Sequence, residues 1–317
     1  MRNRQARVKE VTMNYVACAV CGADDWVVYY ESTLLSENGF NPDAFRCTSI
    51  GYGHHPQIVK CQQCGHIYTN PRWTDEELLG AYSEVEDGIY EAEREKRELT
   101  FSEHLEDLED TTGPPNGRFL LDVGAYIGVF VEVAGASGWN ASGIEPSRWA
   151  VELAGQHGIP VFQGTLDDVL RWDRTYDVIT MWDVIEHLAN PKIEIAKAFE
   201  LLNPGGILAV HTMDIDSKMA RLMGRKWPWL MDMHLHYFSQ KSLIRVFEDV
   251  GYRVVKCEVK GRYLSLGYLS SRVGGINQTI GKVSFAATRR LGIDRTAVKV
   301  NFGDLFSVYG RKPEGSS

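Results

Sequence analysis

Several features are missing from this 317-residue sequence. No apolar run approaches the roughly 20 residues that cross a bilayer, so a membrane-spanning protein is not expected. The N-terminal residues 1–7 are basic but lack the apolar core of a signal peptide, which predicts a cytoplasmic location. Positive charge is not in excess either, because 34 Lys and Arg against 42 Asp and Glu give a formal net charge of −8. A nucleic-acid partner is therefore not expected.

Cysteine is scarce, but its spacing is informative. Four of the six cysteines form two Cys-x-x-Cys pairs, Cys18 with Cys21 and Cys61 with Cys64. Cys47 and Cys257 stand apart from these pairs. In a cytoplasmic protein such pairs indicate a metal site rather than disulfides. Since two pairs supply a closed tetrahedral set of four thiolates, we expect a structural zinc ion. Four free thiols, or a zinc ligand at His66, are the alternatives.

Three segments of different composition predict the domain organisation. Residues 1–73 hold the cysteine pairs and short β-prone runs, so we expect a small zinc-binding module. Residues 74–112 are charged and helical in pattern, beginning with the capping sequence Thr74-Asp-Glu-Glu77, and predict a helical linker. The turn-forming run Gly113-Pro-Pro-Asn-Gly117 then opens the main domain, residues 113–317.

Apolar runs alternate with amphipathic segments in this main domain. We expect strands at 119–123, 141–145, 160–162, 176–182 and 206–212, and two more at 252–259 and 305–310. The alternation predicts an α/β fold with a doubly wound, mostly parallel sheet and helices on both faces. An apolar and basic insertion at 263–293, between the last two strands, is expected to be helical.

The turn after the first strand is a candidate ligand site, because ligands of doubly wound sheets bind beyond the carboxyl ends of the strands. It reads Asp122-x-Gly124-x-x-x-Gly128, so the backbone can approach a ligand closely, and a helix N-terminus follows. Glu145 ends the second strand roughly 20 residues later, where a carboxylate can accept both ribose hydroxyls. This pattern alone is also compatible with an NAD site or with an unoccupied βαβ unit.

The acidic start of the turn separates these alternatives. Asp122 would repel the pyrophosphate of a dinucleotide, whereas a carboxylate favours a ligand with an amino group and a sulfonium. The domain continues with Asp183-Val-Ile-Glu186-His187-Leu and then with Leu202-Asn-Pro-Gly-Gly-Ile-Leu.

With these motifs, the segment from Phe119 to Val210 resembles a class I S-adenosylmethionine-dependent methyltransferase, an enzyme with a Rossmann-like sheet. The resemblance implies S-adenosylmethionine as the cofactor. It assigns cofactor contacts to Asp122 and to Gly124, Tyr126 and Gly128 around the methionine moiety, to Glu145 at the ribose, to Thr165 and Leu166 beside the adenine, and to Trp182 and Asp183 near the methyl donor. Tyr126 departs from the family, which usually has glycine there, so its side chain must point away from the cofactor or pack over it.

The order of zinc module, charged helix and methyltransferase domain resembles a bacterial group that includes deoxysugar C-methyltransferases. Other members of that group act in polysaccharide and natural-product clusters. The resemblance implies a sugar, glycan or natural-product acceptor, in a cleft that the zinc module and the charged helix help to wall.

Two histidine-bearing segments are candidates for the group that removes the acceptor's proton, because histidine is the natural base near neutral pH. Asp183 and His187 follow the fourth strand, close to the expected methyl donor. His234 and His236 follow the fifth strand and are expected to line the acceptor side.

The residues before His234 bear on the acceptor atom. In the sugar C-methyltransferases the matching segment carries a tyrosine and a glutamate, whereas this chain has Met231 and Met233. The difference favours methylation of an oxygen over methylation of a carbon.

Other interpretations remain open. The run Asp183-x-x-Glu186-His187, with a later histidine, is similar to the metal-binding motif of small-RNA end-methyltransferases and of some quinone O-methyltransferases. An RNA methyltransferase and a non-catalytic scaffold are further alternatives. The apolar and cationic segment 218–231 and the 263–293 insertion are compatible with peripheral membrane contact and with a lipid-linked or nucleotide-linked glycan as acceptor.

Overall fold

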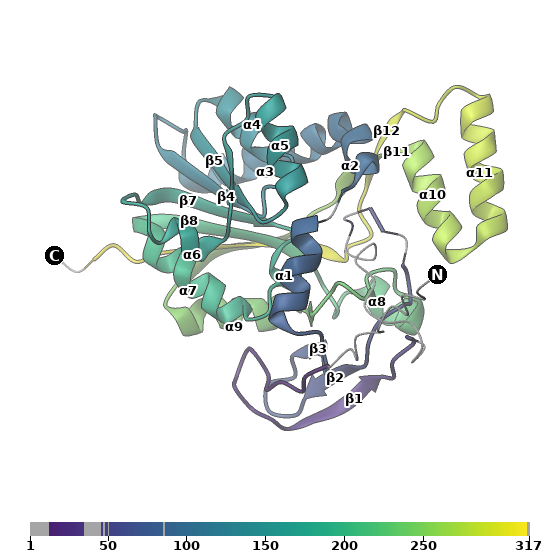
Figure 1. Cartoon of the computed structure of the whole chain (residues 1–317), viewed down its shortest axis with the longest axis horizontal. Coiled ribbons are helices and arrows are strands. Elements are labelled where there is room, and N and C mark those ends of the chain that lie inside the picture. Colours follow the sequence, from purple (N-terminus) through teal and green to yellow (C-terminus); the bar gives the residue numbers. More distant parts are fainter. Residues whose placement is uncertain (1–12, 35–45, 47, 50, 85, 316–317) are drawn as a thin grey trace, which may run out of the picture.

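The structure is a computed structural model that describes residues 13–34, 46, 48–49, 51–84 and 86–315 (Figure 1). Cys47 and the basic segment 1–7 lie outside the described residues. Within the described part of the chain, no helix combines the length and the apolar character needed to cross a membrane.

A seven-stranded sheet forms the centre of the molecule, with strand order β10-β13-β8-β7-β4-β5-β6. Its strands are β4 (Phe119–Val123), β5 (Asn140–Glu145), β6 (Val161–Gln163), β7 (Tyr176–Trp182), β8 (Leu202–Met213), β10 (Arg253–Val259) and β13 (Leu305–Arg311). The five leading strands pair in parallel, and β13 pairs antiparallel with both β8 and β10. The predicted doubly wound, mostly parallel sheet is therefore confirmed.

Helices cover both faces of this sheet, as the alternation of the sequence predicts (Figure 1). They include α3 (Arg94–Thr112), α4 (Val129–Ser137), α5 (Arg148–Gln156), α6 (Leu166–Val169), α7 (Pro191–Leu201) and α9 (Gln240–Val250). Successive residues of β4 point to opposite faces: Leu120 packs in a cluster with Leu108 of α3, and Leu121 in a cluster with Ile195 of α7. Residues 94–112, expected in a linker, thus form a helix whose buried side chains join the core.

The N-terminal region forms a second sheet of order β1-β2-β3-β9. Its strands are β1 (Trp26–Tyr30), β2 (Ile58–Cys61), β3 (Ile67–Thr69) and β9 (His236–Tyr237). The last strand comes from the second half of the chain, and Tyr68 of β3 stands opposite His236 of β9. The N-terminal region therefore shares a sheet with the segment that follows β8, below the central sheet in Figure 1.

The insertion between β10 and β13 is helical, as expected, and is closed at its base by a two-stranded sheet. It consists of β11 (Arg262–Ser265), α10 (Leu266–Ile276), α11 (Gln278–Arg290) and β12 (Ala297–Val300). The two helices cross very closely, since a Cβ added to Gly281 would lie 2.2 Å from the Cα of Gly274.

The remaining elements are short. They are α1 (Asp75–Glu84), α2 (Gly88–Ala92), α8 (Lys218–Met223) and the single 3₁₀ turns η2 (Ile185–His187) and η3 (Gly224–Lys226). The predicted cap of α1 is present: the Thr74 hydroxyl accepts from the Glu77 N–H at 3.2 Å, and the Glu77 carboxylate accepts from the Thr74 N–H at 3.0 Å.

Candidate active site

A cavity of about 810 Å³ opens at the carboxyl ends of β4, β5 and β7, where the strand order reverses. On one side it is lined by the predicted cofactor residues Gly124, Tyr126, Glu145, Thr165, Leu166, Trp182 and Asp183. The other side is built from α1, α3, the segment 228–234 and α10. The cavity thus contains predicted cofactor residues together with residues of α1 and α3, which belong to the charged helical segment expected to help wall the acceptor cleft.

Tyr126 adopts the left-handed conformation that glycine favours, with φ +49°. Its N–H donates to the Glu145 carboxylate at 2.9 Å. The ring packs between Tyr90, with ring centroids 4.5 Å apart, and Trp149, at 5.9 Å. The turn therefore keeps its shape without glycine because aromatic neighbours hold the side chain.

Two predicted cofactor residues lie behind the turn and do not line the cavity. Gly128 caps α4 at φ +79°, and a Cβ there would lie 2.6 Å from a methyl group of Ile159. The Asp122 carboxylate accepts from the Thr180 hydroxyl at 2.6 Å, and burial raises its pKa to about 8. Both residues support the turn from the core side, which corrects the expectation of direct ligand contact.

Glu145, the residue expected to bind the ribose, lies at the cavity wall. Its two carboxylate oxygens accept from the backbone N–H groups of Tyr126, at 2.9 Å, and Ser147, at 2.8 Å. Burial raises its pKa to about 7, although these two N–H groups act in the opposite direction. Each oxygen keeps one further lone pair for a hydroxyl donor in the cavity.

Beside it, Thr165 caps α6 and Leu166 is buried in the helix's first turn, both on the cavity wall where the adenine was expected. Trp182 stacks on His104 with centroids 4.7 Å apart and planes 17° apart. Its indole N–H is buried without a hydrogen-bond partner among the described residues, so a polar ligand group is compatible with this end of the cavity.

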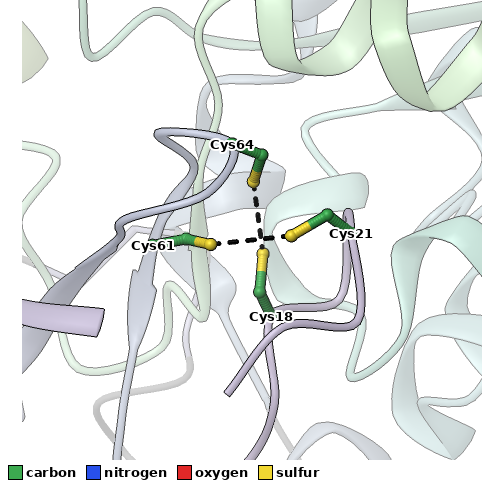
Figure 2. A group of neighbouring side chains, drawn as sticks. All are labelled: Cys18, Cys21, Cys61 and Cys64. Atoms are coloured by element: carbon green, nitrogen blue, oxygen red, sulfur yellow. Dashed lines mark hydrogen bonds between the residues drawn. The ribbon is translucent and has the colours of Figure 1, made fainter. Parts of the chain in front are cut away.

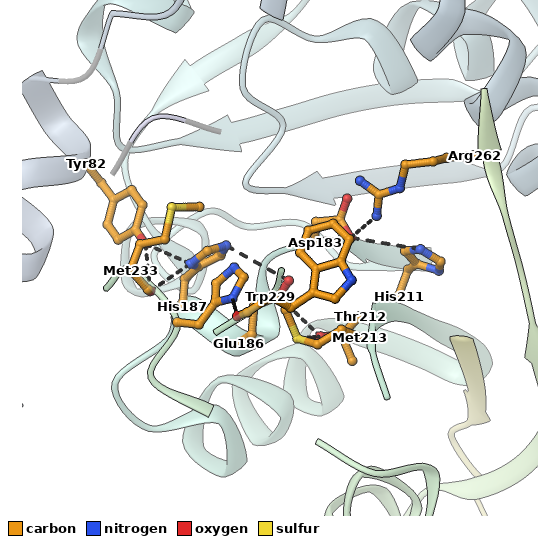
Figure 3. A network of polar contacts seen from close by, with 11 residues as sticks. Tyr82, Asp183, Glu186, His187, His211, Thr212, Met213, Trp229, Met233 and Arg262 are labelled. Atoms are coloured by element: carbon orange, nitrogen blue, oxygen red, sulfur yellow. Dashed lines mark hydrogen bonds and ion pairs between the residues drawn. The ribbon is translucent and has the colours of Figure 1, made fainter. Parts of the chain in front are cut away.

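Asp183, at the end of β7, has a guanidinium and an imidazole as neighbours (Figure 3). Its carboxylate lies 3.2 Å from an Arg262 guanidinium nitrogen and 3.9 Å from His211 Nε2. Burial alone raises the pKa of this carboxyl, but the nearby cations, Arg262 foremost, bring it down to about 2. Asp183 is therefore anionic at neutral pH.

The two histidines at the acceptor side lie close together, with ring centroids 4.9 Å apart. His187 Nδ1 lies 3.0 Å from the Met233 carbonyl and 2.8 Å from the Tyr82 hydroxyl (Figure 3). His234 Nδ1 lies 2.7 Å from the Trp229 carbonyl. Because a carbonyl only accepts, His234 carries its proton on Nδ1 and keeps the lone pair on Nε2, and the Met233 carbonyl favours the same tautomer for His187. Burial lowers the pKa of both rings, to about 3 for His234, so both are neutral at pH 7.

Glu186 completes this group. One carboxylate oxygen accepts from the Thr212 hydroxyl at 2.8 Å, and the other lies 4.0 Å from His187 Nε2. Burial, and then the charge of Asp183, raise the pKa of Glu186 to about 8. One carboxylate oxygen of Glu186 and one ring nitrogen each of His187 and His234 lie within 4.8 Å of one another.

His236 does not reach the cavity, contrary to the expected catalytic role. Its Nδ1 lies 3.0 Å from Nε2 of His66, and its Nε2 lies 3.4 Å from the Ala189 carbonyl. The spacing of two from His234 suggests a shared strand face, but β9 begins only at His236. His234 thus lies before the strand, where the alternation of strand side chains does not apply, and the two histidines have different neighbours: Trp229 for His234 and His66 for His236.

Several cavity residues were missed from the sequence: Tyr82, Arg97, His104, His211, Trp229, Arg262 and Arg272. They come from five parts of the chain that are far apart in the sequence: α1, α3, β8, the segment after η3 and the insertion. No motif or periodicity brings them together, because each belongs to an element whose position only the folded chain defines.

The four paired cysteines converge as the sequence predicts (Figure 2). Cys18 Sγ lies 3.5 Å from Cys64 Sγ, and Cys21 Sγ lies 3.5 Å from Cys61 Sγ. All four sulfurs lie within 4.8 Å of one another, which is compatible with Zn–S bonds of about 2.3 Å around one ion. His66, the alternative ligand, instead contacts His236, and Cys257 lies outside the cluster.

Comparisons with known proteins identify the family. A family model described as a methyltransferase domain matches residues 93–257, more than half of the chain. A ubiquinone biosynthesis O-methyltransferase of Azorhizobium caulinodans is 27% identical over 107 residues, covering 32% of this chain and 42% of the relative. One of Haemophilus ducreyi is 30% identical over 109 residues, covering 31% of this chain and 46% of the relative. The chain thus spans less than half of the length of these curated relatives.

Solved structures with a similar fold include an S-adenosylmethionine-dependent methyltransferase from Archaeoglobus fulgidus, with a TM-score of 0.48 and 14% identity. The alignment covers 71% of this chain and all of the other. A possible histamine N-methyltransferase from Thermotoga maritima aligns with a TM-score of 0.44 and 19% identity, covering 69% of this chain and 90% of the other.

Proposed function

This chain belongs to the family of class I S-adenosylmethionine-dependent methyltransferases, and on that premise we propose that it methylates a hydroxyl oxygen of a small-molecule acceptor. The observation that carries the proposal is the shared cavity: Glu145 lies at one side of it, and His187 and His234 lie at the other.

The residues around the turn fit the cofactor. Glu145 would bind the ribose, Gly124 and Tyr126 would flank the methionine moiety, and Thr165 and Leu166 would contact the adenine. When bound, S-adenosylmethionine supplies a methyl group made electrophilic by the sulfonium. Trp182 and the anionic Asp183 would lie near that positive charge and stabilise it.

His187 would act as the general base. Its protonated Nδ1 is held by the Met233 carbonyl, so Nε2 can take the proton of an acceptor hydroxyl. Tyr82, bound to the same Nδ1, would keep the ring in position. His234 would orient the hydroxyl through its own Nε2, since its Nδ1 is held by the Trp229 carbonyl.

An oxygen acceptor is supported by Met231 and Met233, which line the cavity and offer no proton-abstracting group. The curated relatives are named as O-methyltransferases, which also favours oxygen. A sugar, glycan or natural-product acceptor remains our proposal for the substrate class, since aromatic rings such as Tyr52, Tyr82 and Trp229 on the acceptor side offer stacking faces.

The test uses His187→Asn and His234→Asn, because asparagine keeps a donor near Nδ1 and removes the lone pair at Nε2. Transfer of labelled methyl groups to a panel of sugars, nucleotide sugars and phenols should fall about 10²- to 10⁴-fold in His187→Asn, with unchanged affinity for S-adenosylmethionine. His157→Asn, at an exposed helix end, is the control. Activity within threefold of wild type in both variants would contradict the base assignment.

A second candidate is metal-assisted methyl transfer, favoured by the approach of Glu186, His187 and His234 within 4.8 Å. Two imidazole Nε2 atoms and one carboxylate oxygen are a suitable ligand set for a divalent transition metal that leaves open positions for the acceptor oxygen. Here Glu186 would have to be ionised, which a cation nearby favours.

Chelation distinguishes the two candidates. Dialysis against a chelator, with the zinc content measured, should leave activity intact if His187 is the base. If a metal assists, activity should be lost while zinc stays bound, and Mn²⁺ should restore it in the wild type but not in His234→Asn.

A further inference from the structure

Three arginines from separate elements line the cavity. Arg97 comes from α3, Arg262 from β11 and Arg272 from α10. None of them belongs to the strands that form the cofactor site, and the proposed proton transfer does not use them. The charge of Arg97 lowers the pKa of both Asp183 and Arg272, so the three arginines lie near one another.

Each of these guanidinium groups lies over an aromatic ring. The distances from the guanidinium carbon to the ring centroid are 3.4 Å for Arg97 over Tyr90, 5.1 Å for Arg262 over Trp229 and 4.3 Å for Arg272 over Tyr268. Stacking fixes the plane of a guanidinium and leaves the N–H groups along its edge for planar recognition of phosphate or carboxylate. The wall is therefore built from oriented cations.

The positive charge of this wall is incompletely compensated. Nε of Arg97 and Nε of Arg262 are buried and have no hydrogen-bond partner within the described ranges. Arg97 forms no ion pair with a carboxylate of those ranges, and Arg262 has only Asp183. Buried donors without acceptors are uncommon and indicate a missing oxygen ligand.

Arg272 has partial compensation, since it donates to the Ser49 carbonyl and to the Tyr268 hydroxyl. Both acceptors are neutral, however. Burial lowers the pKa of this guanidinium and the charge of Arg97 acts in the same direction, whereas Tyr52 and the Asp87 carboxylate act in the opposite direction.

We infer that the acceptor carries an anionic group, a phosphate or carboxylate, which Arg97, Arg262 and Arg272 bind while its hydroxyl faces His187. This inference rests on the proposed function, because it names the chemical class of that acceptor. A bidentate contact with a stacked arginine would fix the acceptor's orientation in the cavity. Neutral sugars and phenols would then be poor acceptors beside phosphorylated or carboxylated ones.

The same anionic chemistry has one other source, the carboxylate of the cofactor's methionine moiety. Among the three arginines, Arg97 is the candidate for binding the cofactor's carboxylate. It stacks on Tyr90, and Tyr90 contacts Tyr126 of the β4 turn. The experiment therefore measures the cofactor and an acceptor probe separately.

The probes are phenyl phosphate and phenol, titrated by calorimetry into the protein saturated with S-adenosylhomocysteine. Phenyl phosphate should bind at least tenfold more tightly than phenol, and Arg262→Gln and Arg272→Gln should each weaken it at least tenfold without affecting phenol. Arg272→Lys, which keeps the charge, should recover part of the affinity. Arg174→Gln is the matched control, because Arg174 is an exposed arginine stacked on Phe119 outside the cavity.

Affinities of the variants for S-adenosylmethionine and for its decarboxylated analogue complete the test. The inference predicts unchanged values for both in Arg272→Gln. In Arg262→Gln, which loses the ion pair with Asp183, any loss should be equal for S-adenosylmethionine and for the decarboxylated analogue. The inference is overturned if phenyl phosphate and phenol bind equally, or if the variants weaken S-adenosylmethionine alone, which would assign the arginines to the cofactor's carboxylate. Failure of S-adenosylmethionine to bind the wild-type protein would instead contradict the proposed function, and phenyl phosphate binding would still test the arginines.

Discussion

At the scale of single residues, Glu145 both holds the β4 turn through a hydrogen bond and lines the cavity. Its carboxylate accepts from the Tyr126 and Ser147 N–H groups, so it fixes the turn and presents its remaining lone pairs to the ligand. Hydrogen bonds to a charged acceptor contribute about 1.5–3 kcal/mol each.

The change Glu145→Gln should therefore weaken binding of S-adenosylmethionine about 10- to 100-fold, because the amide has a single acceptor oxygen. Titration calorimetry measures this, with the exposed Glu152→Gln as control. An affinity within twofold of the wild type would mean that the ribose lies elsewhere.

Asp122 is expected to affect the free energy of unfolding and its pH dependence rather than the binding of the cofactor. Since its pKa is raised to about 8 in the folded chain from an ordinary value of 3.8, the folded protein holds a proton that the unfolded chain releases. Its contribution to stability is fully present below about pH 4 and is lost as pH rises through 8.

Replacing Asp122 by asparagine removes this titration. The free energy of unfolding of Asp122→Asn, relative to the wild type, should increase from pH 4 to pH 8, by at most about 1.4 kcal/mol per pH unit. Urea unfolding of the cofactor-free protein at several pH values measures it. The exposed Asp173→Asn should give no such trend, and a flat difference for Asp122→Asn would refute the argument.

Residues that follow a predicted strand directly could be identified from the sequence. Glu145 and His187 lie at the cavity because the carboxyl ends of parallel strands meet at one edge of a sheet. His236 could not be placed in this way, since it belongs to a two-residue strand that exists only through pairing with β3. The positions of Arg97 and Arg262 at the cavity could not be predicted, because the sequence around a cavity arginine does not differ from that around a surface arginine.

At the scale of elements, β4, β7 and β8 were predictable because each holds a short apolar run near turn-forming residues, and β5 was predictable from its place between two helical segments. β9 was not, because a two-residue strand has no periodicity of its own and exists only through pairing with β3. The charge of α3 masked its burial, since only a few of its residues, among them Leu105 and Leu108, contact the core.

The crossing of α10 and α11 gives a test at this scale. Gly281→Ala should force the helices apart, since the added Cβ would lie 2.2 Å from the Gly274 Cα. We expect faster hydrogen exchange in residues 266–290 and weaker acceptor binding, because α10 forms part of the cavity wall. Gly135→Ala in α4, where a Cβ meets no atom within 4 Å, should leave exchange there unchanged. Equal exchange in Gly281→Ala and the wild type would show that the helices tolerate separation.

At the scale of the whole molecule, the cysteine cluster is connected to the acceptor side through one sheet. Cys61 ends β2, β2 pairs with β3, and β3 pairs with β9, two residues after His234. Loss of a bound zinc ion should therefore disturb the acceptor side as well as the N-terminal region.

We expect one zinc ion per chain by elemental analysis, and its loss in Cys61→Ser. That variant should unfold at a lower temperature and lose methyl transfer, yet keep affinity for S-adenosylmethionine, because the β4 turn lies in the other sheet. Cys257→Ser, outside the cluster, should retain zinc and activity. A zinc-free wild-type protein of full stability would contradict the assignment.

The closure of the insertion by β11 and β12 has a consequence for how such enzymes diversify. Arg262 stands opposite Val300, so the insertion leaves and re-enters the fold at one point, between two antiparallel neighbours of the central sheet. A segment attached in this way can be exchanged between homologous genes, or lengthened by recombination, without a change in the order or pairing of the central strands. Acceptor preference can thus drift under selection while the cofactor machinery, encoded mostly in one contiguous stretch, stays as inherited.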